Sequence, residues 1–153
     1  MGNLFGERVS EILPGLYLGG MPWATWDLEG AGISLVVNLA ANLSAHSGEK
    51  SGLTEAHGGG RVGYLHWPLE DGDVPDRDIL SLLVRIIGDG LDEGRGVLVH
   101  CSAGVNRSAL VVALVVRQRT GCSGAEALAL VQERRPGTLR NSSFVAYLED
   151  LGA

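Results

Sequence analysis

The stretch of sequence that decides the fold runs Val97-Leu98-Val99-His100-Cys101-Ser102-Ala103-Gly104-Val105-Asn106-Arg107-Ser108. It starts with a short apolar run, which is typical of a buried strand. A cysteine, five further residues and an arginine follow, and the apolar segment Ser108–Arg119 then predicts a long helix that Gly121 stops. The pattern therefore predicts a strand, a tight loop and a helix in direct succession.

A loop of small residues between a strand and a helix is suited to hold an anion. Its consecutive backbone N–H groups can point inward, and the helix that begins near Arg107 adds the positive end of its dipole. The planar guanidinium of Arg107 can bind two oxygens of a phosphate. Because the same field favours a thiolate at Cys101, the segment predicts a phosphate site with a nucleophile at its floor.

The rest of the chain alternates strand patterns with helix patterns. Further strands are expected at Arg8–Ile12, Leu16–Leu18, Ile33–Leu39 and Tyr64–Trp67. Further helices are expected at Trp23–Ala31, from Pro75 to Gly90 or Gly94, from the capping box Ser123-x-x-Glu126 to a point before Pro136, and at Ser142–Leu151. Residues 41–60, rich in Gly, Ser and His, are expected to form a surface loop. The alternation predicts one α/β domain over residues 1–153, with a central, mostly parallel sheet flanked by helices.

Composition narrows the class of protein further. The chain has 153 residues, 45% of them hydrophobic, so it can bury a sizeable core and is not expected to be disordered. Its apolar runs are shorter than the ~20 residues of a membrane span, and no secretory pattern opens the sequence. The two cysteines, Cys101 and Cys122, fit a reducing compartment. We therefore expect a cytoplasmic protein that can enter the nucleus by diffusion.

Charge is distributed unevenly along the chain. The net charge is −6, but residues 1–100 carry six basic and fourteen acidic residues, whereas residues 101–153 carry six arginines and four acidic residues. The acidic balance argues against a general nucleic-acid or membrane-surface binder. An anion site is expected in the C-terminal third.

The segment His100–Ser108 resembles the phosphate-binding loop of the protein tyrosine phosphatase superfamily, in the form found in dual-specificity phosphatases. Three further blocks are similar to that family in the same order, namely residues 11–19, residues 32–39 and residues 135–144 with Asn141 and Phe144. The resemblance implies a tyrosine-phosphatase-like fold. It also implies a protein phosphatase that acts on phosphotyrosine, phosphoserine and phosphothreonine through a cysteinyl-phosphate intermediate, without a metal or other cofactor.

The resemblance also implies roles for individual residues. Cys101 is the expected nucleophile, and the phosphate oxygens are expected to be bound by Ser102, Ala103, Gly104, Val105, Asn106 and Arg107. The hydroxyl of Ser108 helps the thiolate leave in the second step; its alternative role is a helix N-cap. His100 either orients the loop and supports the thiolate or is a hydrogen-bonded core histidine, and both interpretations stay open.

A phosphoester leaving group also needs a proton, which a carboxylic acid can supply. The acidic turn, residues 70–73, offers Glu70, Asp71 and Asp73, and Asp76 and Asp78 follow it. Residues 67–71 resemble the general-acid segment of the family, so Asp71 is the predicted acid and Asp73 the alternative. Asp76 and Asp78 are expected in the first turn of the next helix, where the dipole favours them.

Alternatives to a protein phosphatase remain open. One is a catalytically weak or dead phosphate-binding module, and another is a phosphatase of a non-protein phosphate, either an RNA 5′ end or a lipid. The loop lacks the lysines that lipid phosphatases of this superfamily tend to carry, and the chain lacks the basic stripe of an RNA binder. The expected partners are phosphorylated proteins, with no nucleic acid, no stable membrane association and a monomeric state.

Smaller features have plain interpretations. Residues 1–6 form an incomplete N-myristoylation signal, because Gly6 replaces the usual Ser or Thr. Cys122 is expected to be a small apolar residue at a helix end. The arginines Arg134, Arg135 and Arg140 form either a solvated face or a rim that attracts phosphorylated segments. The histidines outside the loop show no metal-ligand spacing; they are His46, His57 and His66.

Overall fold

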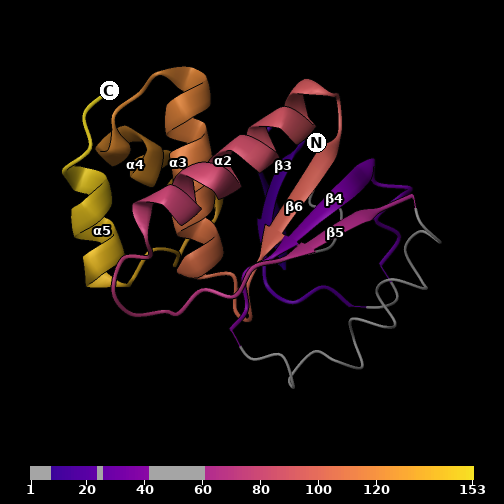
Figure 1. Ribbon diagram of the computed structural model, residues 1–153, viewed down its shortest axis with the longest axis horizontal. Helices are drawn as coiled ribbons and strands as arrows, with labels where there is room; N and C mark the ends of the chain where they lie inside the picture. The colour runs from indigo at the N-terminus through magenta and orange to yellow at the C-terminus, as the bar shows by residue number, and fades with distance from the viewer. Residues whose placement is uncertain (1–7, 24–25, 42–60) are drawn as a thin grey trace.

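The computed structural model describes residues 8–23, 26–41 and 61–153 (Figure 1). The described strands are β2 (Val9–Leu13), β3 (Leu16–Gly19), β4 (Ile33–Asn38), β5 (Gly63–His66) and β6 (Gly96–His100). The described helices are α2 (Arg77–Asp92), α3 (Arg107–Thr120), α4 (Gly124–Arg134) and α5 (Ser142–Glu149). These bounds confirm all five predicted strands and four of the five predicted helices, with shifts of a few residues at their ends.

The strands form one sheet in the order β2-β3-β6-β4-β5. Strands β3, β6, β4 and β5 run parallel, and β2 pairs antiparallel with β3. The central strand β6 pairs on both sides, so that Val97 lies opposite Leu16 of β3 and Leu35 of β4. The carboxyl ends of the four parallel strands therefore meet at one edge, which is where ligands bind in open α/β sheets.

The two faces of the sheet belong to two apolar clusters, because side chains alternate along each strand. Val97 and Val99 join a large cluster that includes residues of all four described helices, whereas Leu98 joins a smaller cluster with Trp26 and Leu28. In the view of Figure 1 the helices occupy the left and upper part and the strands extend to the right. Burying one Val or Leu side chain completely stabilises the fold by on the order of 1.5–3 kcal/mol. Because both faces of β6 are buried in this way, packing holds the strand in place on both sides.

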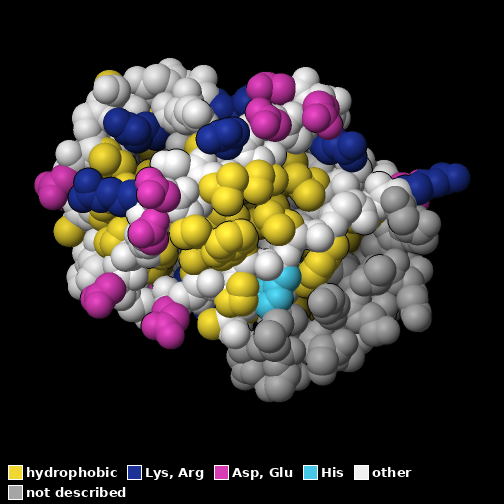
Figure 2. Space-filling model, in the orientation of Figure 1, with side chains coloured by type: hydrophobic (Ala, Val, Ile, Leu, Met, Phe, Trp, Pro, Cys, Tyr) yellow, Lys and Arg dark blue, Asp and Glu magenta, His cyan; other side chains and the backbone are white. Residues whose placement is uncertain are grey.

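Helix α2 shows how the sequence sets one of these packed elements. Asp76 is its N-cap and accepts hydrogen bonds from the backbone N–H groups of Asp78 and Ile79, so Asp76 is the cap and not a first-turn residue as predicted. Asp78 does lie in the first turn. One face of α2 is buried in the core and carries Leu80, Leu83, Val84 and Ile87. On the surface shown in Figure 2, hydrophobic side chains gather near the centre of the view, and charged side chains lie above them and to their left.

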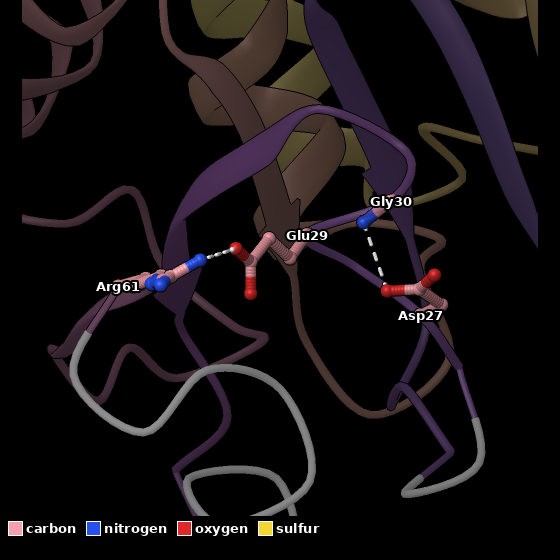
Figure 3. Close-up of polar contacts among 4 residues, drawn as sticks. All are labelled: Asp27, Glu29, Gly30 and Arg61. Carbon is pink, nitrogen blue, oxygen red and sulfur yellow. Dashed lines mark hydrogen bonds and ion pairs between the residues drawn. The ribbon is translucent and has the colours of Figure 1, made fainter.

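The helix predicted over Trp23–Ala31 is wrong for the residues that the structure describes there. Residues 28–32 form turns, and the carboxylate of Asp27 accepts a hydrogen bond of 2.8 Å from the backbone N–H of Gly30 (Figure 3). Such a side-chain bond to the nearby backbone competes with helical hydrogen bonding. Glu29 instead pairs with Arg61 at 2.9 Å, and Leu28 packs under the sheet. None of the described helices is long and apolar enough to cross a membrane.

Two strand glycines offer a matched test of the packing around β6. A Cβ at Gly96 would overlap the carbonyl oxygen of Gly32, which is backbone and cannot turn away, whereas a Cβ at Gly63 would meet only ordinary contacts, the nearest at 3.5 Å. We expect Gly96→Ala to lower the free energy of unfolding by about 1–3 kcal/mol. Gly63→Ala should leave it almost unchanged. Urea denaturation of both variants measures this, and equal stabilities would contradict the described register of β6.

Candidate active site

The cysteine loop, residues 101–107, follows β6 at the carboxyl edge of the sheet and ends at the first residue of α3. Chain segments that follow the other parallel strands lie against it. The backbone N–H of Met21, after β3, donates to Ser102 O at 3.2 Å, and that of Leu39, after β4, donates to His100 O at 2.8 Å. The N–H of Leu69, after β5, donates to Leu39 O at 3.1 Å. The parallel topology thus brings the acidic turn, residues 70–73, into the same region as the cysteine loop.

Gly104 allows the tight turn within the cysteine loop. Its φ of +69° is a conformation that other residues rarely adopt. A Cβ at this position would lie 2.5 Å from the carbonyl carbon of Gly19, so the loop also needs the space that only glycine leaves. The backbone N–H of Gly104 donates to Cys101 Sγ at 3.3 Å, which turns the loop back over the sulfur.

The Cys101 thiol is buried, with 2% of the residue exposed, and surrounded by hydrogen-bond donors. Its Sγ lies 3.2 Å from the Oγ of Ser108, which is also buried. Burial is the largest single influence and opposes ionisation. Hydrogen bonds from the Ser108 hydroxyl and from the N–H groups of Ser108 and Gly104, together with the charge of Arg107, outweigh it and lower the pKa of Cys101. The site therefore favours a thiolate, as the sequence predicts.

The first turn of α3 completes one side of the site. The N-cap residue Asn106 makes no side-chain cap to the helix. Arg107 donates from Nη1 to the carbonyl oxygen of Leu69 at 3.2 Å, and its Nε is buried and has no hydrogen-bond partner among the described residues. Positive charge and helix N–H groups are thus concentrated beside Cys101, an arrangement that suits a phosphate.

Among the carboxylates of the acidic turn, Asp71 is the one that contacts the cysteine loop. Asn106 Nδ2 donates to Asp71 Oδ2 at 2.9 Å, and Asn141 Nδ2 donates to Asp71 Oδ1 at 2.8 Å. Asp73 is exposed, and no hydrogen bond or ion pair joins its carboxylate to any residue that the structure describes. The structure therefore brings together Cys101, Arg107, Ser108 and Asp71, but leaves Asp73 outside.

His100 is fully buried at the end of β6, and its Nδ1 lies 3.2 Å from the carbonyl oxygen of Cys101. This position fits both roles that the sequence left open. Ser102 and Ala103 are exposed at the top of the loop, whereas Val105 and Asn106 are half-buried.

Arg135 departs from its expected place on a solvated face or rim. It is half-buried, its Nε donates to Gly104 O at 3.0 Å, and its Nη1 donates to Ser10 Oγ at 3.3 Å. Burial lowers the pKa of its guanidinium, while the nearby Cys101 thiolate acts in the opposite direction. By holding the Gly104 carbonyl, Arg135 fixes the peptide group that also carries the N–H of Val105. Arg134 stays exposed and lines a cavity of about 420 Å³ beside Gly104 and Val105.

Sequence reasoning placed Arg135 on a solvated face or a rim, and it did not predict that Arg135 holds the cysteine loop or that Asn141 contacts Asp71. Arg135 is one of several arginines near a helix end, so nothing marks it as buried. Asn141 carries a visible signal as an N-cap before α5, because its Oδ1 accepts from Phe144 N at 3.2 Å. Its second role, contact with Asp71, joins residues 70 positions apart and has no local signal.

A metal-ligand cluster of three or more His, Cys, Asp or Glu side chains is absent from the described part of the chain. His46 and His57 lie outside the described residues, as does the N-terminal acylation segment. The Nε2 of His66 lies 2.8 Å from the carbonyl oxygen of Ala40. Cys122 is a free, half-buried thiol just after α3.

Comparison with known families gives one match over most of the chain. The family model described as "Dual specificity phosphatase, catalytic domain" matches residues 16–152, which include the cysteine loop, the acidic turn and Asn141.

Curated relatives include two dual specificity protein phosphatases. Dual specificity protein phosphatase 12 of Rattus norvegicus is 32% identical over 139 residues, covering 88% of this chain and 38% of the relative. Dual specificity protein phosphatase 15 of Mus musculus is 29% identical over 148 residues, covering 96% of this chain and 59% of the relative. The chain thus spans less than two thirds of the length of these relatives.

Solved structures share the fold. Tk-PTP in its active form is 25% identical with a TM-score of 0.79, and 94% of this chain and 97% of that chain are covered. The human tyrosine phosphatase-like serine/threonine/tyrosine-interacting protein is 28% identical with a TM-score of 0.76, at coverages of 94% and 95%. PTPMT1, at 21% identity, a TM-score of 0.79 and coverages of 93% and 92%, shares the fold.

The hydrogen bond between Ser108 and Cys101 can be tested through the reactivity of the thiol. Ser108→Ala removes a donor that favours the thiolate, so the pKa of Cys101 should rise. The rate of alkylation by iodoacetamide against pH, in a Cys122→Ser background, reports only Cys101. We expect its midpoint to move to higher pH in Ser108→Ala.

Ser123→Ala is the matched control, because Ser123 caps α4 and not the cysteine loop. It should leave the alkylation midpoint in place. A midpoint that Ser108→Ala does not move would contradict the role given to the Ser108 hydroxyl.

Proposed function

Because the chain belongs to the dual specificity phosphatase family, we propose that it hydrolyses phosphotyrosine and phosphoserine or phosphothreonine in proteins through a cysteinyl-phosphate intermediate. One observation carries the proposal: the buried Cys101 thiol, with its lowered pKa, lies at the N-terminus of α3 within a loop that also contacts Asp71. A nucleophile, an anion site and a carboxyl group thus converge in one place. That convergence is what cysteine-dependent phosphoryl transfer needs.

In the first step, the Cys101 thiolate attacks phosphorus in line with the ester oxygen. The S–P bond forms and the P–O bond to the leaving group breaks. Arg107 and the backbone N–H groups of the cysteine loop stabilise the negative charge on the equatorial oxygens in the transition state. Asp71 donates a proton to the departing oxygen, so that the product leaves as a neutral alcohol or phenol.

In the second step, water replaces the thiolate. Asp71, now a carboxylate, takes a proton from the water, and the water oxygen forms the new P–O bond. The S–P bond breaks, and the Ser108 hydroxyl, 3.2 Å from Sγ, donates a hydrogen bond to the leaving thiolate. Phosphate dissociates, and the thiolate is restored for the next cycle.

A phosphoprotein substrate is supported by the chemistry of the cysteine loop. The five residues between Cys101 and Arg107 are Ser, Ala, Gly, Val and Asn, none of them charged. A multiply phosphorylated headgroup would meet no extra cation there, whereas a single phosphate on a peptide needs none. PTPMT1, which shares the fold, is known in complex with PI(5)P, so a phosphoinositide is the comparison substrate.

The nucleophile is tested by hydrolysis of p-nitrophenyl phosphate in the presence of a chelator. Wild type should turn over and be inhibited by vanadate, because vanadate resembles the transition state of the transferred phosphoryl group. Cys101→Ser should abolish turnover, since a serine hydroxyl is a weak nucleophile at neutral pH. Cys122→Ser, the matched control, should keep it.

Three results would decide against the proposal or part of it. Turnover that persists in Cys101→Ser would exclude the cysteine mechanism. A wild type that binds phosphopeptides without hydrolysing them would leave a phosphate-binding module. If the enzyme is active, faster hydrolysis of PI(5)P than of phosphotyrosine and phosphothreonine peptides would replace the phosphoprotein substrate with a lipid.

The identity of the acid is tested by a pair of neighbouring variants. We expect Asp71→Ala to lower kcat for a phosphotyrosine peptide by about 10²–10⁴-fold, the usual contribution of a general acid. Asp73→Ala should have little effect, because no hydrogen bond or ion pair joins the Asp73 carboxylate to any described residue. A larger loss in Asp73→Ala than in Asp71→Ala would reverse the assignment.

A further inference from the structure

Both carboxylate oxygens of Asp71 are held by asparagine side chains from two different helix N-termini. Asn106, at the start of α3, donates to Oδ2 at 2.9 Å, and Asn141, at the start of α5, donates to Oδ1 at 2.8 Å. These contacts join residues 35 and 70 positions apart, and they link the acidic turn to the cysteine loop and to α5.

The orientation of the Asn106 amide is fixed by its other bonds. Its Oδ1 accepts from the backbone N–H groups of Arg140 and Asn141, at 2.8 and 3.0 Å. Two backbone donors require an oxygen at that position, so the NH₂ group must face Asp71. Asn106 occupies the N-cap position of α3 but does not cap the helix with its side chain. The amide serves the contact with Asp71 instead.

The Asn141 amide is fixed in the same way. Its Oδ1 accepts from Phe144 N and caps α5, which turns the NH₂ group toward the acidic turn. There Nδ2 donates to Asp71 Oδ1 and also to the carbonyl oxygen of Gly72 at 2.9 Å. The side chain and the backbone of the acidic turn are therefore both tied to α5.

We propose that Asn106 and Asn141 are positioning residues that hold the Asp71 carboxyl group beside the cysteine loop for proton transfer. This inference rests on the proposed function, in which Asp71 is the acid. Each carboxyl oxygen has more than one lone-pair site, so an oxygen that accepts from an amide can still carry the transferred proton. The bond from Arg107 to Leu69 O ties the same segment at a second point. The acid is thereby set in place by rigid helix ends, as precise proton transfer requires.

The test compares kcat/KM for two aryl phosphates, phenyl phosphate and p-nitrophenyl phosphate. Phenol is a poor leaving group and needs the proton, whereas nitrophenolate departs without it. We expect Asn106→Ala to lower kcat/KM for phenyl phosphate by about 10- to 100-fold, the scale of a misplaced catalytic group, and to affect p-nitrophenyl phosphate much less. Asn141→Ser should act in the same direction, because serine keeps the N-cap of α5 but cannot replace the amide donor.

A double-mutant cycle separates positioning from structural damage. If Asn106 acts through Asp71, then Asn106→Ala should cause no further loss of kcat/KM in an Asp71→Ala background. Ser123→Ala removes a helix cap outside the site, so it should leave kcat/KM unchanged for both substrates.

Two results would overturn the inference and leave the phosphatase activity itself established. One is an equal loss of kcat/KM for both substrates in Asn106→Ala. The other is a further loss of kcat/KM when Asn106→Ala is added to Asp71→Ala. A wild type without Cys101-dependent turnover of either ester would overturn the proposed function and the inference together.

Discussion

The placement of a buried thiol between a central parallel strand and a helix N-terminus is the constraint on which the site depends. All five residues of β6 are buried, and nine residues in the first ten of α3 are buried as well. Neither end of the cysteine loop can shift without disturbing the core, because interiors are closely packed. Burial alone would keep Cys101 protonated. The hydrogen bonds from Ser108 and Gly104 and the charge of Arg107 outweigh burial and lower the pKa of Cys101, so the ease with which the thiol ionises depends on the geometry of the loop.

The rest of the fold supports this loop from outside. Arg135, before the turn that leads to α5, holds the Gly104 carbonyl, and the segments after β3, β4 and β5 hydrogen-bond around the loop. The acidic turn is held to it through Asn106 and Asn141. The half-buried guanidinium of Arg135 is costly to leave unpaired. The Asp71 carboxylate is exposed, and its two amide donors orient it. These contacts therefore fix the loop and the acid relative to each other.

Most of the fold could be predicted from local pattern. Apolar runs such as Ile33–Leu39 and the helical spacing of Leu80, Leu83 and Ile87 each reflect one buried face, and Cys101 and Arg107 stand in a motif that a strand and a helix enclose. The helix prediction for Trp23–Ala31 was wrong, because the Asp27 carboxylate accepts a hydrogen bond from the backbone N–H of Gly30, and such a bond competes with helical hydrogen bonding. Asn141 and Arg135 could not be assigned, since their partners lie far away in sequence and only the packed structure brings them together.

The central claim is that Cys101 forms a covalent bond to the transferred phosphoryl group. Rapid acid quench during turnover of p-nitrophenyl phosphate, followed by mass spectrometry of the digested protein, tests it directly, because acid stops the reaction before the intermediate is hydrolysed. The account predicts a phosphate adduct on the peptide that carries Cys101, accumulating in Asp71→Ala if loss of the base slows the second step more than the first. Turnover without any adduct on Cys101, or with the adduct on another residue, would contradict it.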